Sequence, residues 1–202
     1  SSGKLIHSLE GHKSDVNSAV FSPDGTKILT ASADKTARIW ESSSGKLIHS
    51  LEGHTSRVYS AVFSPDGTKI LTASADKTAR IWESSSGKLI HSLEGHTSRV
   101  YSAVFSPDGT KILTASRDKT ARIWESSSGK LIHNLEGHTS YVNSAVFSPD
   151  GTKILTAAWD KTARIWESSS GKLIHSLEGH TSVVNSAVFS PDGTKILTGS
   201  ED

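Results

Sequence analysis

The chain repeats one 42-residue unit almost without change. The seven-residue sequence Asp-Lys-Thr-Ala-Arg-Ile-Trp occurs four times, at residues 34–40, 76–82, 118–124 and 160–166. Residues 43–84 and 85–126 differ only in that Ala75 of one corresponds to Arg117 of the other. A period of this length is typical of folds in which each unit is one small group of secondary-structure elements, stable only when stacked on its neighbours.

By this period the chain divides into five repeats. We expect the boundaries 1–42, 43–84, 85–126, 127–168 and 169–202, the last repeat ending eight residues before its period is complete. The chain also begins with serine and contains no methionine, which favours a processed product, an excised fragment or an engineered array.

The composition argues against several classes of function. The net charge is +1, so the chain lacks the basic surplus that holds nucleic acid. No apolar stretch reaches the length of a membrane span, and the N-terminus lacks the apolar core of a signal peptide. Cysteine is absent, which rules out disulfides and cysteine metal ligands. We expect no nucleic-acid or membrane partner, no cofactor, and a cytoplasmic location, with which the lack of cysteine is compatible.

Each unit carries the signals of four short strands separated by turns. In the first unit, residues 14–21 mix polar and apolar side chains in the manner of a strand. The Ser-Pro-Asp-Gly sequence at 22–25 predicts a tight turn, because proline presets φ and glycine accepts a positive φ. Further strands are predicted at 26–32, 36–40 and 46–51. Four short strands in each repeat are typical of β-propeller blades, so the predicted class is all-β.

The motifs of the unit resemble those of WD40 β-propellers over the whole chain. Every unit has a Gly-His pair, first at Gly11 and His12, and a Phe-Ser-Pro-Asp-Gly turn. The first four units end their third strand in tryptophan. One departure is that glutamate, first Glu41, follows each tryptophan where the family usually has aspartate. That position usually starts a surface loop, so the resemblance still implies four-stranded antiparallel blades, about five in this chain, the last incomplete.

The resemblance implies a buried hydrogen-bonded set of four side chains in each complete unit. Aspartate accepts from a ring N–H of histidine, histidine accepts from a threonine hydroxyl, and that hydroxyl accepts from the indole N–H. Ser32 shares the strand face of Thr30, but the fourth unit has Ala158 there and keeps Thr156, which favours threonine. The implied sets are His12, Thr30, Asp34 and Trp40; His54, Thr72, Asp76 and Trp82; His96, Thr114, Asp118 and Trp124; and His138, Thr156, Asp160 and Trp166.

Two chemical alternatives use the same residue types. Ser, His and Asp together suggest a hydrolase triad, but the combination recurs in every unit and no serine occupies an exposed nucleophile turn. His7 and His12 are candidate metal ligands, yet no third ligand of distinct character accompanies them. We therefore expect no catalytic residue and no metal site, with an enzyme as a remote alternative.

The substitutions between units gather in three columns. Lys4, Glu10, Lys27, Lys35 and Arg38 are expected to be exposed, yet their counterparts never change in the units that contain them, so the variation is not scattered drift. The first column holds Asp15, Arg57, Arg99, Tyr141 and Val183; the second holds Asn17, Tyr59, Tyr101, Asn143 and Asn185; the third holds Ala33, Ala75, Arg117, Trp159 and Glu201.

All three columns are predicted to surround one end of a central channel. The first two share a side at the start of the innermost strand, by the two-residue alternation of strands. The third precedes the turn aspartate beside that start. In WD40 proteins this end is the top face, where partners commonly bind.

The contents of the columns favour a diversified recognition surface. Aromatic residues and arginine are enriched in binding hot spots, and a wide rim of mixed charge favours a protein or peptide partner over a small molecule. The pattern also resembles the WD40 sensor arrays of some microbial non-self-recognition proteins. The alternative is an engineered or excised array with a structural role and no ligand. The expected contact residues are Asp15, Asn17, Arg57, Tyr59, Arg99, Tyr101, Arg117, Tyr141, Asn143, Trp159, Val183, Asn185 and Glu201.

The two ends of the chain predict self-assembly. Residues 4–9 are expected to form an outer strand whose three inner partners lie elsewhere, whereas the last unit supplies two inner strands at 182–189 and 194–200. Unpaired strand edges and bare blade faces are unfavourable. We expect a homodimer in which two chains form one ring of about eight to ten blades, beyond the usual range of propellers.

Overall fold

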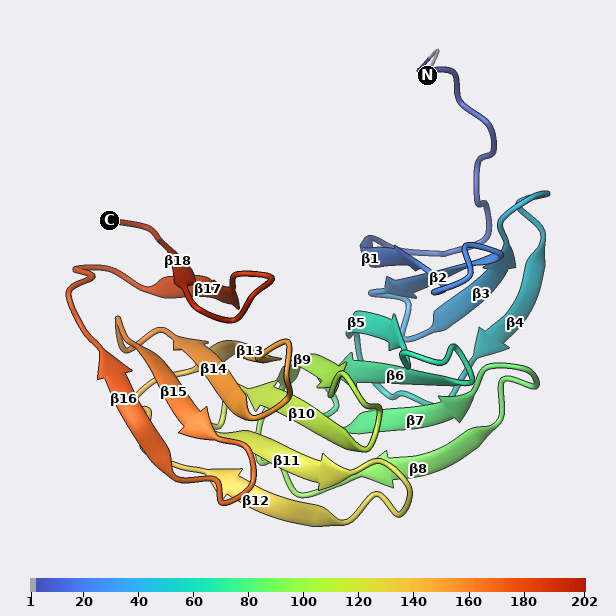
Figure 1. Cartoon of the computed structure of the whole chain (residues 1–202). Coiled ribbons are helices and arrows are strands. Elements are labelled where there is room, and N and C mark those ends of the chain that lie inside the picture. Colours follow the sequence, from blue (N-terminus) through green and yellow to red (C-terminus); the bar gives the residue numbers. More distant parts are fainter. Residues whose placement is uncertain (1–2) are drawn as a thin grey trace.

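The computed structural model describes residues 3–202 and contains four four-stranded antiparallel sheets followed by a two-stranded one, here called blades 1 to 5 (Figure 1). Blade 1 consists of β1 (Val16–Phe21), β2 (Lys27–Ser32), β3 (Ala37–Glu41) and β4 (Leu47–Leu51). Blade 2 consists of β5 (Val58–Phe63), β6 (Lys69–Ser74), β7 (Ala79–Glu83) and β8 (Leu89–Leu93). Blade 3 consists of β9 (Val100–Phe105), β10 (Lys111–Ser116), β11 (Ala121–Glu125) and β12 (Leu131–Leu135). Blade 4 consists of β13 (Val142–Phe147), β14 (Lys153–Ala158), β15 (Ala163–Glu167) and β16 (Leu173–Leu177). Blade 5 consists of β17 (Val184–Phe189) and β18 (Ile196–Ser200).

The predicted all-β class is confirmed, and each of the four complete blades straddles a repeat boundary. The first blade takes three strands from one 42-residue unit and its outer strand, β4, from the next. Within every complete blade the strands pair in chain order, and the first strands of successive blades lie beside one another on the inside of the assembly. None of the residues in the described range 3–202 forms a helix long and apolar enough to cross a membrane.

The turn between the first two strands forms as its sequence predicts. The Gly25 N–H donates to the Ser22 carbonyl at 2.8 Å, and Gly25 has a φ of 71°. Asp24 accepts from the Ser22 hydroxyl at 2.6 Å and from the Thr26 N–H at 3.0 Å. A glycine tolerates this backbone conformation without steric cost, so the same turn recurs in each unit.

The core is divided among the junctions between blades. At the first junction Leu29, Ile39 and Leu51 of blade 1 pack against Ile70 and Trp82 of blade 2, and all five are buried. Equivalent clusters fill the other three junctions. Each blade thus presents a different apolar face to each neighbour, and neither face is covered within its own blade.

The blades follow an open arc, and blades 1 and 5 face each other across its opening without meeting (Figure 1). The two faces at the opening are bare. Val16 and Phe21 of blade 1 are 52% and 65% exposed, and Leu197 of blade 5 is 71% exposed.

The predicted strand at residues 4–9 is wrong for this structure, in which that segment forms no strand. A strand is held by backbone bonds to a neighbour, and no third strand of a preceding blade lies beside this segment. Only its end keeps outer-strand contacts: His7 and Leu9 lie against Gly45, whereas Leu5 and Ile6 are 77% and 83% exposed. The His7 ring Nε2 bonds to the Ser43 carbonyl at 2.8 Å, as His49 of β4 bonds to Ser85 at the same distance.

Candidate recognition surface

The four side chains of the implied buried set meet in each complete blade. In blade 3, the His96 Nδ1 lies 2.7 Å from the Asp118 carboxylate and its Nε2 lies 2.7 Å from the Thr114 hydroxyl. The Trp124 indole N–H donates to the same hydroxyl at 2.9 Å. Blades 1, 2 and 4 repeat these contacts. The set ties the loop that enters a blade to its second and third strands, which makes it a structural clamp. The Ser116 hydroxyl, the rival of threonine, contacts the Ser98 and Arg99 carbonyls instead.

The protonation states follow from the surroundings of the set. Burial works to raise the pKa of Asp118, but hydrogen bonds from His96, the Thr120 hydroxyl and the Thr97 N–H outweigh it and hold that pKa well below its usual range. Burial is the main cause that lowers the pKa of His96, despite the opposing effect of Asp118. A neutral ring that donates through Nδ1 and accepts through Nε2 matches this geometry.

Sequence reasoning missed a fifth set, which lacks its tryptophan. His180 lies 2.8 Å from the Thr198 hydroxyl and 3.0 Å from Asp202. The periodic spacing of the Gly-His pair and of Asp202 was the available signal. The contacts are more exposed than in the other blades, because no indole covers them.

The arginine two residues before each tryptophan is predicted to be exposed, but in the structure it is partly buried. The Arg38 guanidinium covers Gly11, where an added Cβ would clash with Nη1, and the Arg38 Nε is buried. Gly11 also has a φ of 140°, which side chains rarely adopt. The glycine of the Gly-His pair therefore leaves room for the arginine side chain, and this packing explains why the glycine and the arginine do not vary.

The three variable columns come together at the starts of the inner strands. In blade 3 the Arg117 N–H donates to the Arg99 carbonyl at 2.9 Å, which joins the first and third columns, and the other blades have the same bond. The second column sits on a β-bulge, since the pairing of β9 with β10 skips Tyr101. A bulge interrupts the two-residue alternation and re-aims a side chain, so the bulge places this column. The same register shift occurs in the other four blades.

Side chains of the variable columns contact one another across the blade junctions. Tyr59 and Tyr101 have ring centroids 5.3 Å apart, and Arg99 Nη1 lies 3.5 Å from the Tyr59 hydroxyl. The Arg117 guanidinium lies 4.4 Å from the centre of the Tyr141 ring and donates to its hydroxyl at 2.9 Å.

Other residues of the variable columns form hydrogen bonds with the backbone or with one another. Asn17 donates to the Val58 carbonyl at 2.7 Å, and Asn143 donates to the Asn185 carbonyl at 2.8 Å. Asn185 in turn donates to Glu201 at 3.0 Å. Asp15 and Val183 contribute backbone carbonyls to the bonds between columns.

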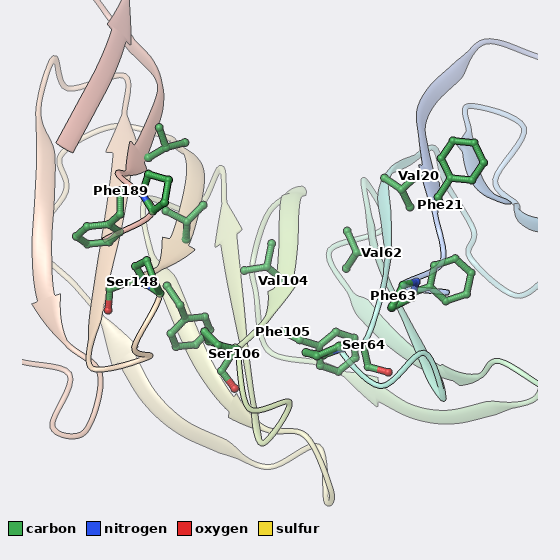
Figure 2. A pocket seen from close by; sticks show the side chains of 18 of the residues that line it. Val20, Phe21, Val62, Phe63, Ser64, Val104, Phe105, Ser106, Ser148 and Phe189 are labelled. Carbon is green, nitrogen blue, oxygen red and sulfur yellow. The ribbon is translucent and has the colours of Figure 1, made fainter. Parts of the chain in front are cut away.

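The opposite end of the inner strands forms an apolar cavity that sequence reasoning missed. It measures about 610 Å³ and is lined by the valine, phenylalanine and proline of all five units and by the serine of the last four, with the phenylalanine side chains of successive inner strands along its wall (Figure 2). The repeated Val-Phe pair ending each inner strand was the available signal. The lining is identical in every unit, whereas the residues at the other end differ. Over residues 3–202, no group of three or more His, Cys, Asp or Glu side chains is arranged to hold a metal ion.

Comparison with known proteins connects these features to a family. The protein named pre-mRNA-processing factor 19 homolog 2 of Arabidopsis thaliana is 49% identical over 41 residues, which is 20% of this chain and 8% of that protein. The similarity thus spans about one repeat, far less than two thirds of that relative. The family model described as WD domain, G-beta repeat matches residues 3–41, 45–83, 87–125, 129–167 and 171–202. These five matches cover almost the whole chain, which therefore belongs to the WD40-repeat family.

Proposed function

We propose that this chain is a non-catalytic recognition scaffold whose binding surface is formed by the three variable columns. The observation that carries the proposal is that most positions that differ between the repeats gather at one end of the inner strands, where several of their side chains meet across blade junctions. WD40 domains generally bind proteins or peptides, which supports a partner of that kind. Constant blades with a varied rim suit a sensor whose specificity changes by substitution. The lack of cysteine fits the cytoplasmic location that we propose.

A swap between units tests this surface. In the variant Arg99→Asp, Tyr101→Asn and Arg117→Ala, three residues take the identities that the first unit carries. We expect proteins captured from a lysate of the source cells by the original chain to be lost from this variant. The matched control is Lys88→Gln, Lys130→Gln and Lys172→Gln, three exposed constant positions that lie outside the columns. Equal capture by all three chains would instead support the purely structural role.

A second proposal, favoured by the bare faces at the opening, is that two copies close into one ring of about eight to ten blades. Blade 1 exposes Val16 and Phe21, whose counterparts Val58 and Phe63 pack against blade 1 itself. Blade 5 exposes Leu197, whose counterpart Leu29 is buried on blade 2. Blade 1 therefore carries one half of an internal junction, and blade 5 carries the part of the other half that its two strands supply. Light scattering that finds only a 21.5 kDa monomer would exclude this assembly.

Charge at the rim offers a sharper test of the ring. Inside the chain, the third column of one blade meets the first column of the next, as Arg117 meets Tyr141. In the proposed joint, the same positions hold Glu201 of one copy and Asp15 of the other, and two carboxylates repel. We expect Glu201→Arg to strengthen association about three- to tenfold, by the cost of like-charge contacts at interfaces. Glu94→Arg makes the same charge change in the middle of the arc and should leave association unchanged.

A further inference from the structure

A cluster of aromatic and cationic side chains crosses the middle of the variable rim. Tyr141 and Trp159 of blade 4 have ring centroids 5.2 Å apart, and Arg117 of blade 3 stacks on the same Tyr141 ring. Trp159 is 42% exposed, whereas the other four tryptophans are buried. A large exposed indole beside a stacked arginine is the composition of a binding hot spot.

A second cluster adjoins it over blades 2 and 3. Tyr59 and Tyr101 form a tilted pair, and Arg99 points its guanidinium at the Tyr59 hydroxyl. Arg57 occupies the first column beside them and is exposed. The two clusters together place three arginines and four aromatic rings on three successive blades.

The three arginines are not neutralised by the chain. No ion pair within residues 3–202 involves Arg57, Arg99 or Arg117. The partners of Arg99 and Arg117 are phenol hydroxyls and not carboxylates. Each guanidinium therefore keeps donors for an anionic oxygen, which it binds in a planar, two-pronged geometry.

The carboxylates on the same blades either accept hydrogen bonds from other groups or form no ion pair with these arginines. The turn aspartates Asp76 and Asp118 spend their oxygens on histidine, threonine and backbone donors. Glu52 and Glu94, on the loops that enter blades 2 and 3, make no ion pair with an arginine. The negative charge that would match these arginines is thus left for a ligand to supply.

We propose that this basic and aromatic cluster binds an acidic peptide segment, with aspartate or glutamate side chains on Arg57, Arg99 and Arg117 and an apolar or aromatic side chain against Trp159. The proposal rests on the recognition function proposed for the rim and narrows its partner to one chemistry. Phosphorylated residues present the same kind of anionic oxygen and are distinguished by experiment.

Binding of defined peptides tests the proposal. The probes are a fluorescein-labelled peptide of alternating Glu, Asp and Leu, which is left unlabelled for the tryptophan measurement, the same peptide with Gln and Asn, the same peptide with phosphoserine in place of Glu, and a single-stranded oligonucleotide. We expect anisotropy to show binding of the acidic peptide at least tenfold tighter than of its amide form, weakening with added salt. Bound peptide should also protect Trp159, the one indole more than slightly exposed in the described range, from quenching by acrylamide.

Substitutions assign the site. Arg99→Gln and Arg117→Gln should each weaken binding of the acidic peptide about fivefold or more, as loss of a charged hydrogen bond predicts, and Trp159→Ala should abolish the quenching protection. Lys153→Gln removes an exposed cation from the other end of blade 4 and should change nothing. Unchanged thermal unfolding of every variant establishes that the fold is kept.

Three results would overturn the proposal: equal binding of the acidic and amide peptides, equal effects of Arg117→Gln and Lys153→Gln, or preference for the oligonucleotide. A strong preference for the phosphoserine form would move the ligand from carboxylate to phosphate and also reject the stated chemistry. If these peptides fail while capture from the lysate still depends on Arg99, Tyr101 and Arg117, only the ligand class is wrong and the recognition surface stands.

Discussion

The inner junctions and the two open ends are built from the same sequence but have opposite exposure. Val100 of blade 3 is fully buried, whereas its counterpart Val16 is half exposed; Leu113 is fully buried, whereas its counterpart Leu197 lies mostly in solvent. The repeat is identical at these positions, so the difference comes from the missing neighbouring blade and, at Leu197, also from the missing third strand of blade 5. A single blade of this chain therefore supplies only part of the stability of the fold, and contacts with neighbouring blades supply the rest.

The largest difference between inner and terminal blades is expected at the buried histidine. His96→Ala leaves Asp118 and Thr114 without their partner in a site that Trp124 closes, and should lower the free energy of unfolding by about 2–4 kcal/mol. His180→Ala removes the same contacts in blade 5, where water reaches them, and should cost about 1 kcal/mol or less. Urea unfolding of both variants measures the two values. Equal losses would mean that the blade 5 set is as well enclosed as the inner ones.

The next largest difference is expected at the apolar faces. Ile112 is fully buried between blades 2 and 3, so Ile112→Ala should cost about 3 kcal/mol, whereas the partly covered Ile28 should cost about 1 kcal/mol. The comparison holds for dilute protein. If two copies close into a ring, the cost of Ile28→Ala should grow with protein concentration, and a loss that stays constant over a hundredfold range would contradict closure.

The contrast between local contacts and contacts with a neighbouring blade also explains which features the sequence predicts and which it does not. The period, the turns and the four-residue sets follow from local chemistry, and the strands formed within two residues of their expected ends. The strand at residues 4–9 was wrong because pairing depends on a neighbour that local signals do not reveal. Arg38 was misjudged because charge suggests exposure, whereas its place above Gly11 depends on three-dimensional packing.

The variable rim was predicted only in part, because some of its features depend on strand pairing and on neighbouring blades. Substitution between repeats identified the three columns, and the structure joins the first and third by a backbone bond in each blade. The β-bulge under the second column leaves no mark in the residue pattern, since it is a property of how two strands pair. The stacking of Arg117 on Tyr141 depends on which blades are adjacent and how their rims are oriented, and a column read along one chain carries no such information.

A smaller effect is expected on acidification, which should lower the stability of the chain through the buried histidines of the inner blades. Burial lowers the pKa of His96 and His138 below the ordinary value of 6.5, so the unfolded chain binds more protons as the pH falls. Stability should therefore decline from about pH 6.5 downward and fall further below about pH 4, where unfolded aspartates take up protons that Asp118 resists. The melting temperature measured from pH 7 to pH 4 checks the sign. His96→Gln with His138→Gln should make the decline above pH 4 shallower, and a stability that rises on acidification would contradict the neutral buried rings.

The smallest expected effect is one that should not distinguish inner from terminal blades at all. Lys35 in blade 1 and Lys119 in blade 3 both adopt a left-handed turn conformation, with φ of 74° and 73°. Glycine relieves that strain but raises the entropy of the unfolded chain, so Lys→Gly at either site should change stability by only about 0.5 kcal/mol in the stabilising direction. Because the turn is local, Lys35→Gly and Lys119→Gly should give the same value in urea unfolding. Unequal values would show that the stability of the turn also depends on the neighbouring blade and is not local.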